Sequence, residues 1–230
     1  MESKRKVAIF DIDGTIFRSS LLIELLNALI EAELFPKEAR ALYEKEYNKW
    51  LNRKGSYEDY VEAFVAAFMI HLKGVYYGDF ADAAEKMIAL HKDRVYRYTS
   101  DLIKDLKKKN YYLLAISQSP KTALDGFCKH LGFDKVYGRI YELGPEECFT
   151  GEIVDLHLIA NKANIVKRAV EKEKLTLKDS IGVGDTEGDI SFLEMVETPI
   201  CFNPNAMLYK HSKRMKWKVV IERKDVIYEL

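Results

Sequence analysis

Residues 6–15 read KVAIFDIDGT, and this stretch decides the expected fold. Its first half, residues 6–10, is a short run of apolar, β-branched and aromatic side chains. The run stops at two acidic residues, Asp11 and Asp13, followed by the turn residue Gly14. A short apolar run closed by turn residues is typical of a buried strand. We therefore expect a buried β-strand with a pair of carboxylates at its carboxyl end.

Similar apolar runs follow later in the chain, and each ends at a polar residue. They are residues 111–116 before Ser117, residues 180–184 before Asp185, and residues 199–202 before Asn203. Helical patterns separate these runs, at about 120–131, 160–173, 188–196 and 204–215. Strands that alternate with helices predict an α/β fold, a Rossmann-like, mostly parallel sheet flanked by helices. Such sheets bind ligands at the carboxyl ends of their strands, where these polar residues stand.

The segment from residue 18 to residue 95 breaks this alternation, because it holds only helical patterns. The expected helix starts are Ser20 as a cap, Pro36 at a first helical position, Ser56 with Asp59 as a capping box, and Asp79 as a cap. We expect an inserted helical cap domain at 18–95 and an α/β core domain made of 1–17 and 96–230. The alternative is an N-terminal helical bundle that packs elsewhere.

A further strand pair is expected late in the chain. Residues 136–154 alternate weakly between apolar and polar side chains around a Gly-Pro turn. This pattern predicts a β-hairpin, which we assign to the core domain.

The overall composition excludes several classes of protein. The 230 residues include 36 Lys plus Arg and 36 Asp plus Glu, so the formal net charge of zero argues against a nucleic-acid partner. No apolar run approaches the roughly 18 residues of a membrane-spanning helix, and the N-terminus lacks the features of a signal peptide. The three cysteines show no zinc spacing and fit a reducing compartment. We therefore expect a cytoplasmic protein with no membrane partner.

The two carboxylates after the first strand suit phosphate ester chemistry. In a continuing strand, Asp11 and Asp13 share a face and reach the same small space. One carboxylate can attack phosphorus to form an aspartyl phosphate. The other can protonate the leaving alkoxide and then deprotonate the attacking water. Because two close carboxylates repel each other, we also expect Mg²⁺ between them, a cation that prefers oxygen ligands.

The residues around the acidic pair, and a second acidic cluster, complete this hypothesis. Gly14 allows a tight turn and a close approach of backbone amides to phosphate, and Thr15 can hydrogen-bond Asp13. The cluster GDTEGD at 184–189 follows another apolar strand, so that Asp185 is placed to bind the same metal. Asp189 can bind the metal directly or through water. The alternative is a helix N-terminal turn, where acidic residues are favoured by the helix dipole.

Candidate phosphate-binding residues come from two other segments. Ser117 ends the middle strand and is followed by Gln118, Ser119 and Pro120. Pro120 fits the first turn of a helix, so we expect Ser119 to be its cap. A hydroxyl and free amides at a strand-to-helix turn form an anion site, although the serines can also act only as helix caps. Lys162, near the start of the next helix, can neutralise the nucleophile and the phosphoryl group. Its rivals for that role are Lys167 and Arg168.

In this order, FDIDGT, Ser117, Lys162 and GDTEGD resemble the haloacid dehalogenase superfamily of phosphohydrolases, over nearly the whole chain. The helical insertion, SQSPK, the FTGEI hairpin end and GVGDTEGDISFLE look like its phosphoserine-phosphatase-like branch, subfamily IB. Phosphoserine phosphatases tend to carry a glutamate soon after the first motif and Ser-Gly-Gly at the second. This chain instead has Arg18-Ser19-Ser20 and Ser117-Gln118-Ser119.

The resemblance implies a role for each candidate residue. Asp11 would be the phosphorylated nucleophile and Asp13 the acid/base. Mg²⁺ would be held by Asp11, the main-chain carbonyl of Asp13 and Asp185, with Asp189 in support. The phosphate-binding residues would be Ser117 and Lys162, together with Gly14, Thr15 and Gln118.

The leading functional hypothesis is a phosphatase that acts on a small phosphorylated metabolite. Two alternatives remain within enzymes, a phosphoserine phosphatase and a phosphotransferase that passes phosphate to an alcohol. A third is a non-catalytic binding module with the same fold. The oligomeric state is expected to be a monomer or a homodimer.

Overall fold

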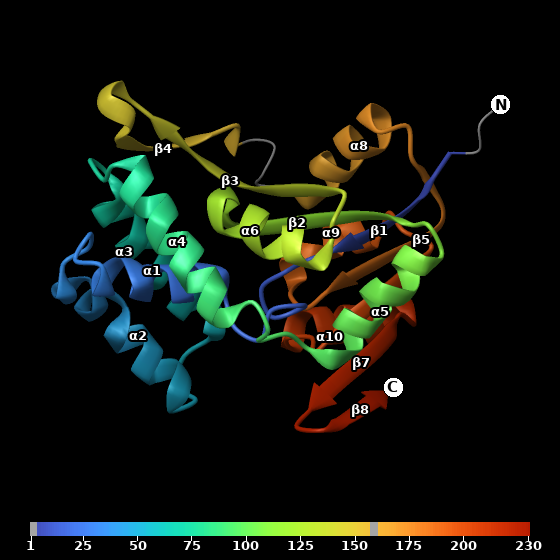
Figure 1. The fold of residues 1–230 in the computed structure, drawn as a ribbon. Coiled ribbons are helices and arrows are strands. Elements are labelled where there is room, and N and C mark those ends of the chain that lie inside the picture. Colours follow the sequence, from blue (N-terminus) through green and yellow to red (C-terminus); the bar gives the residue numbers. More distant parts are fainter. Residues whose placement is uncertain (1–3, 157–160) are drawn as a thin grey trace. The chain divides into compact units, whose positions relative to one another are not determined.

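The computed structural model describes residues 4–156 and 161–230, and its strands form one sheet (Figure 1). The strand order is β4-β3-β2-β1-β5-β6-β7-β8. Neighbours pair in parallel from β3 to β7, and the β3-β4 and β7-β8 pairs are antiparallel. The predicted mostly parallel sheet flanked by helices is confirmed. The strands are β1 Lys6–Phe10, β2 Tyr112–Pro120, β3 Lys135–Leu143, β4 Phe149–Val154, β5 Thr176–Gly184, β6 Thr198–Phe202, β7 Lys218–Arg223 and β8 Val226–Glu229.

Helices connect these strands. They are α1 Leu21–Glu31, α2 Ala41–Leu51, α3 Tyr57–Leu72, α4 Tyr77–His91, α5 Arg97–Lys108, α6 Lys121–Leu131, α8 Lys162–Lys172, α9 Ile190–Leu193 and α10 Ala206–Met215. Short 3₁₀ turns cover Lys37–Arg40, Pro145–Glu147 and Glu187–Asp189. The expected helix at 160–173 begins at Lys162, and residue 160 lies outside the described residues.

Strand β1 lies in the middle of the sheet and aligns the ends of its neighbours. Its residues Val7 and Ile9 belong to a buried apolar cluster with Ile165 and Val166 of α8, as the alternation of side chains along a strand requires. In the ladder, Phe10 is opposite Ala115 of β2 and also opposite Val183 of β5. The residues that follow these three positions therefore meet at one edge of the sheet.

The chain divides into two compact units. The sheet unit comprises Met1–Leu21, His91–Arg139 and Asp155–Leu230, and the helical unit comprises Leu22–Leu90 and Ile140–Val154. The expected division placed the hairpin in the core domain. In the structure the outer part of the hairpin, residues 140–154, groups with the helices instead.

Aromatic side chains build the core of the helical unit. Phe68 is fully buried, and its ring centroid lies 5.6 Å from Tyr141 of the hairpin and 6.4 Å from Phe80. Phe80 in turn lies 4.9 Å from Phe149. These ring contacts explain why the hairpin groups with the helices, because they bury large apolar surfaces from both segments. The capping box predicted at Ser56 is present, with reciprocal hydrogen bonds to Asp59.

Several local predictions were wrong. Strand β2 continues to Pro120, so that Pro120, and not Ser119, occupies the N-cap position of α6. Asp79 lies inside the first turn of α4 and does not cap it. Strand β5 begins at Thr176, four residues before the expected start. The expected helix at 188–196 is a 3₁₀ turn followed by the four residues of α9.

Candidate active site

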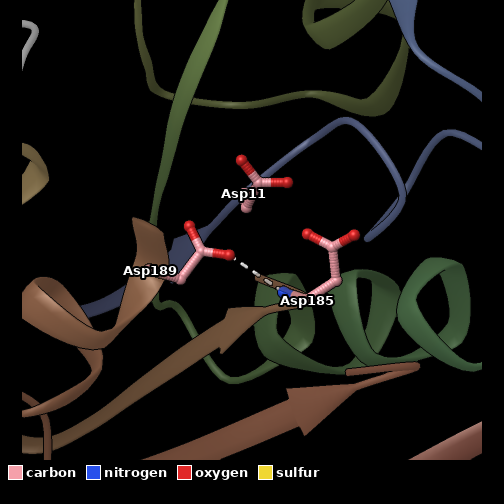
Figure 2. Close-up of side chains that lie close together, drawn as sticks. All are labelled: Asp11, Asp185 and Asp189. Carbon is pink, nitrogen blue, oxygen red and sulfur yellow. Dashed lines mark hydrogen bonds between the residues drawn. The ribbon is translucent and has the colours of Figure 1, made fainter. Parts of the chain in front are cut away.

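Three carboxylates meet at the carboxyl edge of the sheet. Asp11 follows β1, while Asp185 and Asp189 follow β5, and one oxygen of each lies within 4.8 Å of the others. Figure 2 shows the three side chains pointing into the same small space from these two segments. The backbone N–H of Asp11 donates to Val183 O at 2.9 Å, which keeps the loop after β1 attached to β5.

Two glycines make this close approach possible. Gly14 has a φ of 78°, a left-handed conformation that side chains rarely adopt, and a Cβ there would overlap Oδ2 of Asp185. At Gly184, a Cβ would lie 2.6 Å from the side chain of Asp189. Each glycine therefore leaves room for one carboxylate of the cluster.

Lys162 is a buried cation shared by two of the carboxylates. Its Nζ lies 2.5 Å from Oδ1 of Asp11 and 2.5 Å from Oδ1 of Asp189. Asn161 positions it by capping α8, since its side chain accepts the N–H of Ala163. Burial acts to lower the pKa of Lys162, but the two carboxylates outweigh it and raise this pKa. Lys162 therefore stays charged in the site.

Asp11 combines burial with an unsatisfied oxygen. Burial raises the pKa of Asp11 to about 7, and the attraction of Lys162, which is divided with Asp189, only partly opposes this. Its Oδ1 accepts from Lys162, but its buried Oδ2 has no hydrogen-bond partner among the described residues. A buried acceptor without a partner is costly, and a bound group would satisfy it.

Asp13 has different surroundings, because both of its oxygens are engaged. Oδ1 accepts the backbone N–H of Leu21 at 2.5 Å. Oδ2 accepts the hydroxyls of Ser117 at 2.5 Å and Ser119 at 2.8 Å. The expected contact with Thr15 is absent, since the buried Thr15 hydroxyl has no partner among the described residues.

Ser119 is the site residue that the sequence interpretation missed. It was expected to cap α6, yet its hydroxyl contacts Asp13 because β2 continues through it. Residues two apart in a strand face the same way, so the Ser-Gln-Ser spacing was the available signal. Gln118, between the serines, accepts a hydrogen bond at its Oε1 from Nε of Arg139 at 2.9 Å. The side chain of Gln118 is thus held by a residue of the next strand.

Asp189 and Asp185 differ in how many hydrogen bonds they accept. Asp189 takes Lys162 on Oδ1 and the backbone N–H groups of Asp185 and Thr186 on Oδ2, at 2.9 and 3.1 Å. Asp185 is half-buried, and burial raises its pKa well above its usual range. Asp189 therefore holds the turn and the lysine, whereas Asp185 presents its carboxylate to the shared space.

Comparison with known proteins identifies the family. The model of the haloacid dehalogenase-like hydrolases matches residues 8–194. The chain belongs to this family. The phosphoserine phosphatase of Methanocaldococcus jannaschii is 22% identical over 240 residues, which cover 98% of the chain and 96% of that protein. The inhibition of morphological differentiation protein of Streptomyces azureus is 22% identical over 94% of the chain and 78% of that protein.

Solved structures agree with this assignment to the haloacid dehalogenase-like fold. A protein of unknown function from Bordetella pertussis Tohama I has a TM-score of 0.72 at 17% identity, with 96% of the chain and 99% of that protein covered. A phospho-aspartyl intermediate analogue of phosphoserine phosphatase has a TM-score of 0.63 at 22% identity, with coverage of 97% and 96%. The predicted resemblance to the phosphoserine-phosphatase-like branch is confirmed, and the matches indicate a phosphatase.

The donor set of this haloacid dehalogenase-like hydrolase fits a divalent cation. One oxygen each of Asp11, Asp185 and Asp189 lies within 4.8 Å of the others, and within the described ranges the carboxylate of Asp185 accepts no hydrogen bond. Hard cations such as Mg²⁺ prefer such carboxylate oxygens. Within residues 4–156 and 161–230, no helix is both long and apolar enough to cross a membrane.

Proposed function

We propose that the chain is a magnesium-dependent phosphomonoesterase that acts through an aspartyl phosphate on Asp11. The observation that carries this proposal is the buried, unpartnered Oδ2 of Asp11, beside Asp185 and with the other oxygen held by Lys162. A carboxylate in this setting is oriented by its lysine and keeps one oxygen free for attack. The substrate is proposed to be a small phosphorylated metabolite.

In the first step, Oδ2 of Asp11 attacks the phosphorus and the bond from phosphorus to the leaving oxygen breaks. Asp13 gives its proton to that oxygen, so that an alcohol leaves. Because the N–H of Leu21 occupies Oδ1 of Asp13, the transferable proton belongs on Oδ2. The hydroxyls of Ser117 and Ser119 contact Oδ2, and hydroxyls can donate or accept, so they orient Asp13 in both protonation states.

In the second step, water attacks the phosphorus of the phosphoaspartate. The ionised Asp13 takes a proton from the water, and the bond from phosphorus to Asp11 breaks to release inorganic phosphate. Lys162 neutralises negative charge at Asp11 in both steps. The charge of Asp189 holds this lysine in place on its other side.

Mg²⁺ would be held by Asp11, Asp185 and the main-chain carbonyl of Asp13, with Asp189 in support. When bound, it would offset the charge of the phosphoryl oxygens. Ser117, Lys162 and Gln118 are the proposed phosphate contacts. The expected contacts from the amides of Gly14 and Thr15 are not proposed, because the N–H of Gly14 donates to Phe17 O and Ser19 O and that of Thr15 donates to Ile12 O. The helices and the hairpin of the helical unit are proposed to form the cap that determines specificity.

The test is to trap the phosphoenzyme. The wild-type chain, Asp11→Asn and the surface control Asp125→Asn are mixed with Mg²⁺ and an aryl phosphate labelled at phosphorus, and acid-quenched. We expect labelled protein in the wild type and the control, cleaved by hydroxylamine as an acyl phosphate is, and none in Asp11→Asn. Label retained by Asp11→Asn, or turnover by that variant at the wild-type rate, would refute the nucleophile.

Hydrolysis and phosphate transfer are separated by the products. The same reaction is repeated with glycerol or ethanol added at high concentration. A hydrolase yields inorganic phosphate alone, whereas a phosphotransferase also yields the phosphorylated alcohol. Release of phosphate without any transfer supports the proposed hydrolysis.

A further inference from the structure

Arg18 follows the loop that carries Asp11 and Asp13. Arg18 is exposed, and among the described residues no carboxylate lies within ion-pair distance of its guanidinium. Its guanidinium carbon instead lies 5.4 Å from the ring centroid of Tyr96, a cation–π contact. Such an arginine has its hydrogen-bond donors free while the ring limits its movement.

The backbone places Arg18 close to the nucleophile loop. The N–H of Gly14 donates to Phe17 O at 3.0 Å and to Ser19 O at 3.1 Å, so the residues on both sides of Arg18 fold back onto Gly14. Gly14 is also the position that contacts the carboxylate of Asp185. The N–H of Arg18 itself donates to Arg94 O at 2.9 Å.

Tyr96 forms a fixed platform for this side chain. Its N–H donates to Ile16 O at 2.9 Å, and its ring packs edge-on against Phe202, with centroids 4.9 Å apart. Burial chiefly raises the pKa of the Tyr96 phenol, Arg18 lowers it, and Asp185 raises it further. The charges of Arg18 and Asp185 thus both act on the phenol of Tyr96.

The excess of carboxylates over cations in the acidic cluster indicates what this arginine can bind. The cluster holds four carboxylates, Asp11, Asp13, Asp185 and Asp189, and one ammonium group, that of Lys162. A divalent cation would only balance the two charges of a bound phosphate. Any second anionic group on the substrate would therefore be repelled, unless another cation lies at the edge of the cluster.

We propose that Arg18 binds a second anionic group of the substrate, a carboxylate or another phosphate, and so selects phosphomonoesters that carry such a group. This inference rests on the proposed phosphatase function. The guanidinium fork suits both groups, because it can donate two parallel hydrogen bonds to their oxygens. Arg18 acts on specificity and not on the transfer of phosphate.

The test compares matched substrates that differ only in the second group. One pair is 3-phosphoglycerate and glycerol 3-phosphate, for a carboxylate, and the other is glucose 1,6-bisphosphate and glucose 6-phosphate, for a second phosphate. We measure kcat and KM for the wild type, Arg18→Gln and Arg18→Lys. The wild type should prefer the more anionic member of at least one pair, and Arg18→Gln should reduce that preference by about 10–100-fold, mainly through KM.

Arg18→Lys should keep part of the preference, because it retains the charge and loses the fork. Added guanidinium ion should restore part of the preference in Arg18→Gln and leave the wild type unaffected. The matched control is Arg214→Gln, the same loss of charge in the last turn of α10. A preference that persists in Arg18→Gln, or a wild type with no preference in either pair, would overturn the proposal.

These outcomes are separable from a failure of the phosphatase assignment. Suppose that the wild type hydrolyses an aryl phosphate through Asp11, but Arg18→Gln still prefers the more anionic substrate of a pair. Only the proposed role of Arg18 is then refuted. If the wild type hydrolyses no phosphomonoester with Mg²⁺, both proposals fall together. Equal melting temperatures of the three chains exclude misfolding as the cause of a change.

Discussion

The two compact units bury different kinds of side chain. In the described parts of the chain, all of the buried charged, serine and threonine residues belong to the sheet unit. The buried side chains of the helical unit are aliphatic, aromatic or methionine, with tyrosine the only type that carries a hydroxyl. A buried charge costs free energy that packing does not recover, whereas buried aromatic rings stabilise directly. The difference indicates that the buried charges of the candidate active site lower the stability of the sheet unit, whereas apolar packing stabilises the helical unit.

Replacing the proposed nucleophile, Asp11, is the strongest test of this difference. Asp11→Asn should lower turnover roughly 10⁴-fold or more, the range seen when a covalent nucleophile is removed. In EDTA at pH 8 it should nevertheless raise the free energy of unfolding, by about 1–3 kcal/mol. The raised pKa of Asp11 means that its ionised form destabilises the folded state, and Lys162 keeps Asp189 as a partner when Asp11 becomes a neutral amide. Urea unfolding and a phosphatase assay on the same preparation measure both. A clear loss of stability would contradict the comparison.

The opposite result is expected in the helical unit. Phe68→Ala should lower the free energy of unfolding by about 3–5 kcal/mol, because it leaves a cavity among Phe35, Phe80 and Tyr141. Phe68→Leu, which fills most of the volume, should cost clearly less. Urea denaturation provides both values. A loss below about 1 kcal/mol for the alanine variant would show that this core is not tightly packed.

The pH dependence of the free energy of unfolding tests the buried carboxylates, all of which, among the described residues, belong to the sheet unit. The pKa of Asp11 is about 7 in the folded chain against 3.8 as its ordinary value, so the folded state binds more protons between these limits. The stabilisation that comes from protonated Asp11 is therefore fully present below about pH 4 and is lost as the pH rises through 7. In EDTA, the free energy of unfolding should fall by up to about 3 kcal/mol between pH 5 and pH 8.

Two controls accompany this measurement. Asp11→Asn should reduce the dependence on pH but keep the part that comes from the raised pKa of Asp185. Saturating Mg²⁺ should raise the melting temperature more at pH 8 than at pH 5. Stability that rises from pH 5 to pH 8 in EDTA would show that the buried carboxyl is not the dominant group.

The smallest effect is expected at a helix end. Ser56→Ala removes the hydroxyl that accepts the N–H of Asp59, and should lower the free energy of unfolding by about 0.5–2 kcal/mol. Ser100→Ala, at a serine inside α5, is the matched control and should change little. Thermal unfolding of the two variants side by side measures the difference. Equal changes would mean that the capping box contributes no stability.

The sequence predicted the features that repeat with a regular period. Strand β1, the alternation of strands with helices, and the capping box at Ser56 depend on local patterns, and the structure contains each of them. Asp11, Asp185 and Asp189 meet because parallel strands align their carboxyl ends, which is a general property of such sheets. The site could be predicted to this extent without knowing a single contact.

The remaining features depend on contacts between distant segments. Ser119 was mistaken for a helix cap because Pro120 resembles a first helical residue, whereas pairing of β2 with β3 keeps this stretch extended. The hairpin joins the helical unit through the rings of Tyr141 and Phe149, and no local pattern indicates that packing. Arg139 reaches Gln118 only because β2 and β3 are neighbours.

The ion pair between Asp11 and Lys162 has a consequence for protein synthesis. Its two residues are separated by 151 positions, and Asp189 follows later still. A ribosome that adds about 5–20 residues per second needs roughly 8–30 s to cover that interval. During this time the first strand has left the ribosome with its carboxylates exposed to water and ionised. Asp11 can therefore enter its buried position beside Lys162 only when most of the chain has been made.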